Sequence, residues 1–315
     1  MNKKSYAPIV LFVYNRSEHT CNTVQALQKN DLARESELFI YSDGPKDDPH
    51  SKDKVAEVRA FIKTITGFKK TTIVESEQNK GLAESVIQGV TDIVDRYGRV
   101  IVLEDDLKTS PDFLRFMNEA LDRYEDEPQV MQISGHMFDV KIKADTDAVF
   151  LPFVTSWGWA IWKRSWDCFD PSLSNYTKIK NDKQLMHRFN LDGAYNYFNI
   201  LDSQFHGKID SWAILWYLSV FFQNGLVLYP INSFVLNIGF DGSGTHCGVA
   251  SSERGEPSFS SFARKIFRFP KVRIDQEAYT NVKLFLSARG TSRSKGKSIL
   301  RRETFLTRLG HFFSS

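Results

Sequence analysis

Short apolar runs alternate with segments of helical periodicity through the first 135 or so residues of the chain. The apolar, strand-like runs cover 8–14, 37–43, 71–76, 99–105 and 129–135. Between them, apolar residues recur at helical spacing over 18–29, 52–65 and 82–97. A further helix is predicted to begin at Ser110-Pro111, with the serine as its N-cap and the proline in its first position. This alternation predicts an α/β fold with a mostly parallel central sheet that helices cover on both faces.

The pattern changes after about residue 150. A tryptophan-rich stretch (156–166) is followed by a polar stretch (171–209) and an apolar helix (212–222). A strand-like run (225–231) and a glycine-rich loop (239–248) come next. We therefore predict one domain over 1–255, with a first half to about residue 135 and an acceptor-side second half over about 136–255. A separate basic region is predicted over 256–315.

The composition is that of an ordinary soluble globular protein, with 315 residues, 42% hydrophobic and 25% charged. The three cysteines are far apart and form no CxxC pair, which argues against a disulfide framework or a structural zinc site and favours a reducing compartment. No apolar run reaches the roughly 18 residues of a membrane span, and the N-terminus lacks the apolar region and cleavage site of a signal peptide. These features predict a cytoplasmic protein.

Charge is unevenly distributed along the chain. From Ala263 to Gly310 there are 13 Lys or Arg against 3 Asp or Glu, a local charge of +10 in a chain whose net charge is +3. Apolar residues between Ile299 and Phe313 suit a short amphipathic helix that lies on the anionic inner face of a membrane. A solvated, disordered tail is the alternative interpretation of the same residues.

Polar clusters end three of the predicted strands, at Arg16, at Asp43 and at Glu104-Asp105-Asp106. Ligands of open α/β sheets bind outside the carboxyl ends of the strands, so these clusters predict a shared site. Carboxylates suit Mg²⁺ or Mn²⁺ held together with substrate phosphates. A solvated acidic turn is the alternative for the three carboxylates, and a turn-forming role is the alternative for Asp43.

Three further segments have both a functional and a structural interpretation. Asn79-Lys80 leads through a glycine into a helix whose start favours an anionic ligand, although Asn79 as a simple N-cap explains the segment as well. Asp210 is either the N-cap of the apolar helix or a general base for an acceptor hydroxyl. His246, in the glycine-rich loop, either contacts a phosphate or is an ordinary loop residue.

Several stretches together resemble the nucleotide-sugar glycosyltransferases of the GT-A fold, and they occur in the same order. They are YNRS, YSDGP, NKGLAES, VIVLEDDLKTSPDFLRF, SWGWAIW, IDSW and GSGTH. The chain is most similar to the N-acetylglucosaminyltransferase I type, in which Glu-Asp-Asp replaces the usual Asp-x-Asp. The resemblance covers about residues 7–250. Its most specific part is EDDLxxxPDF, whereas NKGLAES is shared much more widely.

The resemblance implies a role for each matching residue. Asp106 resembles the ligand of a Mn²⁺ or Mg²⁺ ion, and Asp210 resembles the catalytic base, although Ser211 replaces the second acid of that motif. Contacts to the nucleotide sugar are implied for Arg16, Asp43, Asn79, Lys80, Glu104, Asp105 and His246. An acceptor- and donor-side loop is implied at Trp157, Gly158 and Trp159, although tryptophans in this stretch also suit a packed core.

The implied activity is metal-dependent, inverting transfer of a sugar from a nucleoside diphosphate donor, UDP-linked and in particular UDP-GlcNAc, to a glycan or lipid-linked acceptor. Eukaryotic members carry a membrane anchor and a stem that this chain lacks, which favours a cytoplasmic enzyme of surface polysaccharide synthesis with no nucleic-acid partner. Two alternatives remain open. A sugar-nucleotide pyrophosphorylase would require a glycine-rich loop after the first strand, where this chain reads YNRSEHT. A non-catalytic carbohydrate-binding protein would not require the acidic residues.

Overall fold

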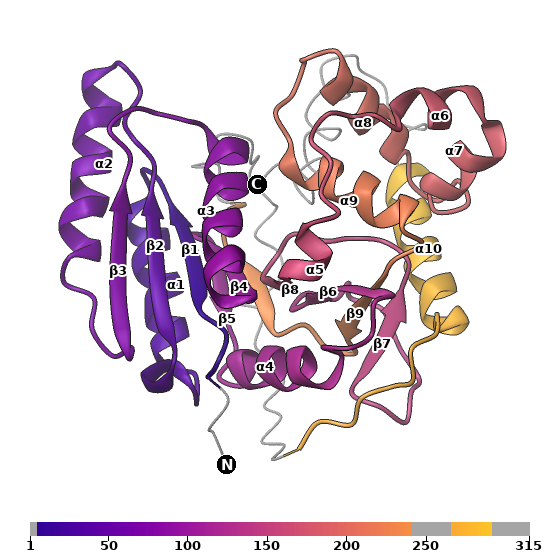
Figure 1. Ribbon diagram of the computed structural model, residues 1–315, viewed down its shortest axis with the longest axis horizontal. Helices are drawn as coiled ribbons and strands as arrows, with labels where there is room; N and C mark the ends of the chain where they lie inside the picture. Colours follow the sequence, from indigo (N-terminus) through magenta and orange to yellow (C-terminus); the bar gives the residue numbers. More distant parts are fainter. Residues whose placement is uncertain (1–4, 241–265, 292–315) are drawn as a thin grey trace.

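The computed structural model describes residues 5–240 and 266–291 of the chain. Its centre is an eight-stranded sheet in the order β3-β2-β1-β4-β8-β6-β9-β7, and a two-stranded sheet pairs β10 with β5 (Figure 1). The strands are β1 Ile9–Val13, β2 Glu37–Ser42, β3 Lys70–Glu75, β4 Arg99–Glu104, β5 Leu107–Thr109, β6 Val130–Ser134, β7 Ala148–Leu151, β8 Trp159–Trp162, β9 Leu226–Pro230 and β10 Val235–Asn237.

Helices lie on both faces of the sheet, as the alternation predicts. Helices α1 and α2 pack against each other on one face, while α3, α5 and α9 are in contact on the other (Figure 1). The helices are α1 Ser17–Gln28, α2 Pro49–Ile62, α3 Leu82–Tyr97, α4 Phe113–Arg123, α5 Lys163–Trp166, α6 Tyr176–Asn181, α7 Lys183–Phe189, α8 Tyr197–Phe205, α9 Trp212–Phe222 and α10 Gln276–Thr291, with a 3-10 turn at Ala33–Glu35. The prediction of an α/β fold with a mostly parallel, helix-flanked sheet is confirmed.

The first half of the sheet is parallel and fully buried at its centre. Strand β1 pairs in parallel with β2 on one side and with β4 on the other, and every residue of β1 and β4 is buried. Continuous apolar runs such as IVLFV and VIVL suit strands that helices cover on both faces. The arrowheads of β1, β2 and β3 point to the same edge in Figure 1, so the loops that follow them share that edge.

The second half of the sheet is mixed. Strand β8 runs antiparallel to both of its neighbours, β4 and β6, and β7 runs antiparallel to β9. Four-residue β8 consists of WAIW, the centre of the tryptophan-rich stretch, and all four residues are buried. This stretch therefore forms an internal strand that joins the two halves of the sheet.

Two predicted helix starts are wrong by one or more residues. Helix α4 begins at Phe113 with Asp112 as its N-cap. The buried hydroxyl of Ser110 has no hydrogen-bond partner within the described residues, so Ser110 does not cap the helix. Helix α9 has Ser211 as its N-cap, so Asp210 lies outside the helix and the capping interpretation of Asp210 is wrong.

The described part of the basic region, 266–291, packs on the edge of the sheet at β7. Ile274 forms a bridge with Phe150, and the backbone of Arg268 exchanges two hydrogen bonds with Asp147, both 2.8 Å. Helix α10 then buries Ala278, Val282 and Leu286, which recur every four residues along one face. The remaining residues of the basic region, on which the amphipathic prediction rests, lie outside the described part of the chain.

No helix in the described part of the chain combines the length and apolar character that a membrane crossing requires. The most apolar one, α9, has 11 residues and is buried against the sheet.

Candidate functional site

The candidate site lies where the chain reverses its winding direction. Strands β1 and β4 are neighbours, with Phe12 paired to Glu104, yet the helices that follow the first strands lie on one face and α3, which precedes β4, lies on the other. A crevice at the carboxyl ends of the strands forms at such a switch point. The residues that follow β1 and β4, Arg16 and Asp105-Asp106, are therefore brought together, as the sequence predicts.

Arg16 is the positive partner of the acidic residues in the structure. One nitrogen of its guanidinium, Nη2, donates to Oδ1 of Asp105 and, at 2.9 Å, to Oδ2 of Asp106. Burial opposes a charge on Arg16, but the two carboxylates outweigh it and hold the pKa of the guanidinium above its usual value. Burial also raises the pKa of the Asp105 carboxyl, an effect that Arg16 counteracts.

Backbone and glycine contacts fix the acidic residues in place. The carbonyl of Asp105 accepts from the hydroxyl of Thr23 at 2.7 Å, and that of Asp106 accepts from the backbone N–H of Ile238 at 2.9 Å. A Cβ added to Gly239 would collide with Oδ2 of Asp106 and would lie 3.0 Å from Nη1 of Arg16. The segment after β10 therefore passes so close to the acidic cluster, which consists of Glu104, Asp105 and Asp106, that only glycine fits at position 239.

The acidic residues suit a divalent cation. Oδ1 of Asp106 is buried and has no hydrogen-bond partner within the described residues. A buried carboxylate oxygen without a donor is costly, and a hard cation is the natural partner of such an oxygen. Within the described residues, no group of three or more His, Cys, Asp or Glu side chains is arranged around one point as a complete ligand set. A cation held by Asp106 would thus need ligands from a substrate or from water.

Asp43 organises the loop that leads into α3. Its Oδ1 accepts from the N–H groups of Gly44 (2.8 Å) and Lys80 (2.9 Å). Its Oδ2 accepts from the N–H of Gly81 and from the side chain of Asn79, both at 3.0 Å. A carboxylate offers about four lone-pair sites, so these bonds occupy all of them. The side chain of Asp43 therefore anchors loop 79–81 beside the end of β2.

Asn79 and Lys80 reach the site mainly through this loop. The side chain of Asn79 also donates to the carbonyl of Gly44 at 2.9 Å, and the N-cap of α3 is Gly81 rather than Asn79. The ammonium of Lys80 donates to Gln88 at 2.6 Å on the exposed surface of α3. The N-cap interpretation of Asn79 is thus wrong, and a structural role in holding loop 79–81 replaces it.

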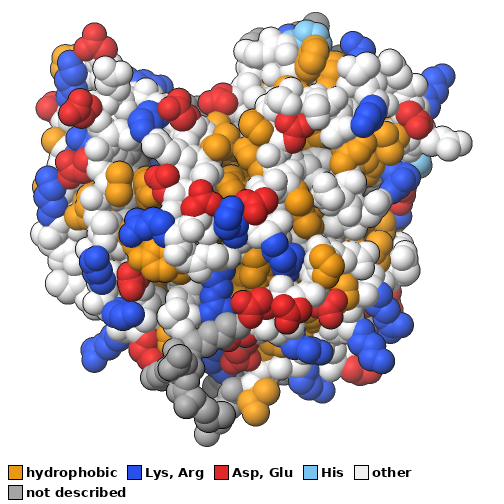
Figure 2. Space-filling model, viewed as in Figure 1, with side chains coloured by type: hydrophobic (Ala, Val, Ile, Leu, Met, Phe, Trp, Pro, Cys, Tyr) orange, Lys and Arg blue, Asp and Glu red, His pale blue; other side chains and the backbone are white. Residues whose placement is uncertain are grey.

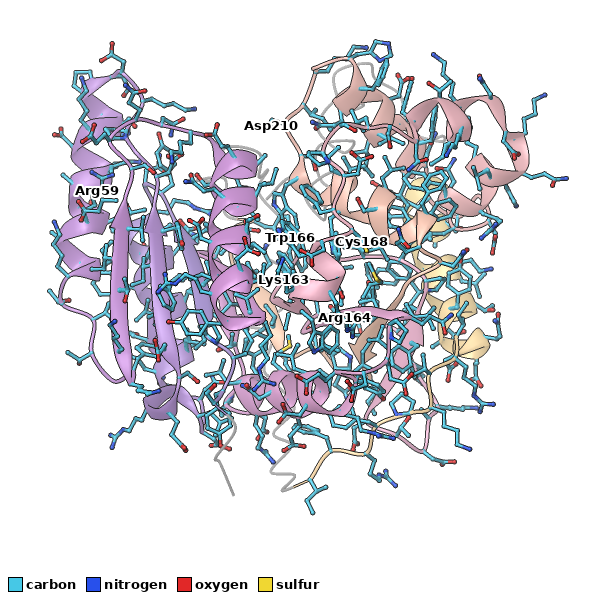
Figure 3. The ribbon with its side chains drawn as sticks, viewed as in Figure 1. Arg59, Lys163, Arg164, Trp166, Cys168 and Asp210 are labelled. Carbon is cyan, nitrogen blue, oxygen red and sulfur yellow. The ribbon has the colours of Figure 1, made fainter. Side chains whose placement is uncertain are left out.

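Asp210 approaches this loop from the other half of the molecule. A Cβ added to Gly81 would lie 3.8 Å from Oδ2 of Asp210, whose side chain is exposed. In Figure 3, Asp210 lies on the segment between α8 and α9, beside the first turn of α3. Figure 2 shows a notch at the top of this face, between the α2 side and the α8 side. The candidate base and the loop that Asp43 anchors therefore face the same opening.

Two polar groups follow Asp210 at the start of α9. The hydroxyl of Ser211 and the indole N–H of Trp212 are buried, and neither has a hydrogen-bond partner in the part of the chain described. The backbone N–H of Ser211 donates to Gln204 at 2.7 Å, so the start of the helix is held in place. Buried donors without acceptors favour a polar ligand at this end of α9.

The predicted loop of Trp157, Gly158 and Trp159 lies inside the molecule. Trp159 is 1% exposed and stacks on Trp212, with ring centroids 5.0 Å apart. Trp157 is 8% exposed and packs edge-on to His136 at 4.6 Å. Gly158 has a positive φ of 59° and its carbonyl accepts from Gly135 at 2.6 Å. Neither indole face is open to a sugar ring in this arrangement.

Two residues of the site, Arg59 and Gly239, were not predicted from the sequence. Arg59, on α2, donates to the carbonyls of Asp43 (3.3 Å) and Ser76 (2.6 Å), and so ties together the ends of β2 and β3 (Figure 3). No local signal marks an arginine in a helix for this role. Gly239 did have a signal, because it opens the glycine-rich loop. His246, in the same loop, lies outside the described residues.

Comparisons with known proteins give only distant similarities. No family model matches the sequence, and no curated protein matches it. Among solved structures, a mannosyltransferase from Pyrobaculum calidifontis in complex with GDP-Man and Mn²⁺ covers 70% of this chain and 70% of its own, with 13% identity and a TM-score of 0.38.

The TarS protein of S. aureus covers 74% of this chain and 37% of its own, with 13% identity and a TM-score of 0.41. Its fragment 1–349 in complex with UDP-GlcNAc covers 48% of this chain and 40% of its own, with 14% identity and a TM-score of 0.34. This chain thus spans less than half of the TarS chains it matches. At such scores the similarities carry no argument for function, which must rest on the site itself.

Proposed function

We propose that the protein is a glycosyltransferase of the GT-A type, resembling N-acetylglucosaminyltransferase I, that uses a nucleoside diphosphate sugar as donor. The observation that carries the proposal is the meeting of two halves of the molecule. The acidic cluster and the loop anchored by Asp43 lie at the carboxyl ends of the parallel strands, and Asp210 faces that loop from the other half. A donor bound at the acidic cluster and an acceptor bound at Asp210 would therefore lie side by side.

Most donor-binding residues are proposed to lie in the first half of the chain, where Glu104 and Asp105 would contact the ribose and the sugar. From the second half, His246 is proposed to contact the nucleotide. Asp43 acts through loop 79–81, because its own oxygens are occupied. Asp106 would hold a Mn²⁺ or Mg²⁺ ion through its buried Oδ1, and that ion would offset the charge of the diphosphate.

Asp210 is proposed to be the general base. Its exposed carboxylate takes the proton of an acceptor hydroxyl while that oxygen attacks the anomeric carbon. The new carbon–oxygen bond forms as the bond to the diphosphate breaks, and the nucleoside diphosphate leaves with the bonding electrons. Attack from the face opposite the leaving group inverts the configuration. The unpartnered donors of Ser211 and Trp212 suit oxygens of the acceptor beside this base.

The substitution Asp210→Asn tests this role. It keeps the shape of the side chain but removes the base, so transfer should fall by about 10²–10⁴-fold while nucleotide affinity stays unchanged. The assay measures release of nucleoside diphosphate from UDP-, GDP- and CDP-sugars in the presence of glycan or lipid-linked acceptors. Asp145→Asn, at an exposed position before β7, is the matched control. Full activity of Asp210→Asn would show that another group is the base.

The donor and the acceptor follow from the resemblance rather than from the geometry. We propose a UDP-linked donor, UDP-GlcNAc among the candidates, and an acceptor in surface polysaccharide synthesis on the cytoplasmic side of a membrane. The basic residues over 260–315 are proposed to contact anionic lipid. Sedimentation with anionic liposomes, with and without residues 292–315, measures the part of this contact that the last residues make. Equal sedimentation of the two proteins would contradict contact through 292–315, and no sedimentation of either protein would contradict the contact as a whole.

A further inference from the structure

The buried carboxylates at the end of β4 have an internal cation. Arg16 forms an ion pair with Asp105 and another with Asp106, and a single nitrogen atom of Arg16 serves both. The side chains of the two aspartates are 7% and 6% exposed, so water stabilises their charges little. Nη2 of Arg16 therefore lies at the point between the carboxylates where a cation is most strongly favoured.

We propose that Arg16 competes with the divalent cation for the carboxylate of Asp106, and that the cation binds fully only when Arg16 leaves its ion pairs with Asp105 and Asp106. The inference rests on the proposed function, which assigns a cation to Asp106. A guanidinium has five donors and no lone pair, so it cannot become a ligand of the cation. A cation on Oδ1 of Asp106 and the guanidinium on Oδ2 would share one carboxylate, and two positive charges so close repel each other strongly where water is largely excluded.

The contacts indicate that Arg16 is the partner that moves. The aspartates are held through their carbonyls by Thr23 and Ile238, and Gly239 lies directly against Asp106. The side chain of Arg16 is 17% exposed, and its only side-chain hydrogen bonds within the described residues are those to the two carboxylates. Its backbone remains fixed at the N-cap of α1, where its carbonyl accepts from Thr20 at 2.9 Å. The side chain can thus rotate away while the acidic residues keep their positions.

The displaced guanidinium would have a new anionic partner. The diphosphate of the donor lies, under the proposed function, against the cation at Asp106, which is within reach of the Arg16 side chain. Guanidinium groups pair well with phosphate oxygens through two parallel hydrogen bonds. Arg16 is therefore a positioning residue that stabilises the acidic cluster before the donor arrives and pairs with the diphosphate afterwards. Cation and nucleotide should consequently strengthen each other's binding.

Mn²⁺ alone is the probe that tests this competition. Its binding is measured by the loss of the free-ion electron paramagnetic resonance signal, on the wild type and on Arg16→Met. We expect Arg16→Met to bind Mn²⁺ about tenfold more tightly and to melt at a lower temperature without metal. Arg99→Met removes a buried arginine that pairs with Asp122 outside the site, so it should lower the melting temperature and leave Mn²⁺ affinity unchanged.

A second measurement needs no variant. Phenylglyoxal modifies accessible arginines, and peptide mass spectrometry reports the extent at Arg16. Mn²⁺ should increase modification of Arg16 in the wild type and leave that of Arg99 unchanged.

The outcomes separate the two proposals. Equal or weaker Mn²⁺ binding by Arg16→Met, or unchanged modification of Arg16, would overturn the competition while leaving the cation site in place. Absence of Mn²⁺ binding by both proteins would overturn the competition together with the proposed cation site.

Discussion

Two groups of conspicuous side chains lie close to each other in the core, one at the end of β4 and one on β8, α5 and α9. Burial has opposite consequences for them. The acidic cluster (Glu104, Asp105 and Asp106) places charges where water is scarce, and Arg16 compensates only part of that charge. The tryptophan cluster (Trp159, Trp166, Trp212 and Trp216) places apolar rings in the same core, with centroids 5.0–6.1 Å apart along the chain of contacts.

The difference between the two clusters shows which kind of buried side chain indicates a ligand site. Buried aromatic rings gain free energy from burial and from their mutual contacts, so their presence needs no ligand. Buried carboxylates lose hydration, so they are retained where a cation or a donor pays for it. In this protein the tryptophan cluster therefore maintains the fold, and the acidic cluster is the part for which we propose a ligand.

The largest expected effect on stability comes from the tryptophan cluster. Trp159→Ala should lower the free energy of unfolding by about 3–5 kcal/mol, because it removes a ring that is 1% exposed and stacked on Trp212. Urea unfolding followed by circular dichroism measures this change. Leu284→Ala, at a side chain that is 64% exposed on α10, is the control and should change stability by less than about 0.5 kcal/mol. A small effect of Trp159→Ala would mean that the ring is not part of the core.

Gly239→Ala is expected to lower stability less than Trp159→Ala does, and to weaken ligand binding. The added methyl group of Gly239→Ala would press on Asp106 and Arg16, so Mn²⁺ and nucleotide binding should weaken while stability falls by about 1–3 kcal/mol. Gly207→Ala is the control for a destabilising change far from the site, because its φ of 66° disfavours alanine while no atom lies within 4 Å of the new Cβ. If both variants bind alike, contact between Gly239 and the acidic cluster does not matter for the site.

The aromatic side also predicts a pH dependence through His136, whose ring packs against Trp157. Burial lowers the pKa of His136 from 6.5 to about 3 in the folded protein. Between these values the unfolded chain binds the extra proton, so the contribution of His136 to stability is present above pH 6.5 and is lost as pH falls. The loss is at most about 1.4 kcal/mol for each pH unit.

Urea unfolding between pH 4 and pH 6.5 tests this dependence, because this interval lies between the two pKa values of about 3 and 6.5. His136→Gln should show a flatter decline than the wild type, and His50→Gln, at an exposed position, should keep the wild-type slope. A slope unchanged by His136→Gln would show that this histidine is not the source of the dependence.

Local patterns were sufficient for the first half of the fold. The apolar runs that became β1 to β4 and β6 and the periodic segments that became α1 to α3 were all predicted, because parallel buried strands and amphipathic helices have strong local signals. The convergence of Arg16 and the acidic cluster followed from the same reasoning, since strand ends meet at one edge of a parallel sheet.

Features that depend on distant pairing were not predicted. The role of WAIW as strand β8 depends on antiparallel partners in β4 and β6, and the position of Ile274 depends on Phe150. The ion pair of Arg16 requires β1 and β4 to be neighbours, which no local pattern states. The occupied carboxylate of Asp43 likewise depends on a loop 36 to 38 residues further along the chain.

The most direct test of the proposed cation and nucleotide site is calorimetric titration of UDP, GDP and CDP, each with and without Mn²⁺, on the wild type and on Asp106→Asn. The expected result is that one nucleotide binds the wild type in a Mn²⁺-dependent way and that this dependence disappears in Asp106→Asn, which removes the charge of the buried carboxylate. Failure of the folded wild type to bind any of the three nucleotides, or unchanged Mn²⁺-dependent binding by Asp106→Asn, would contradict it.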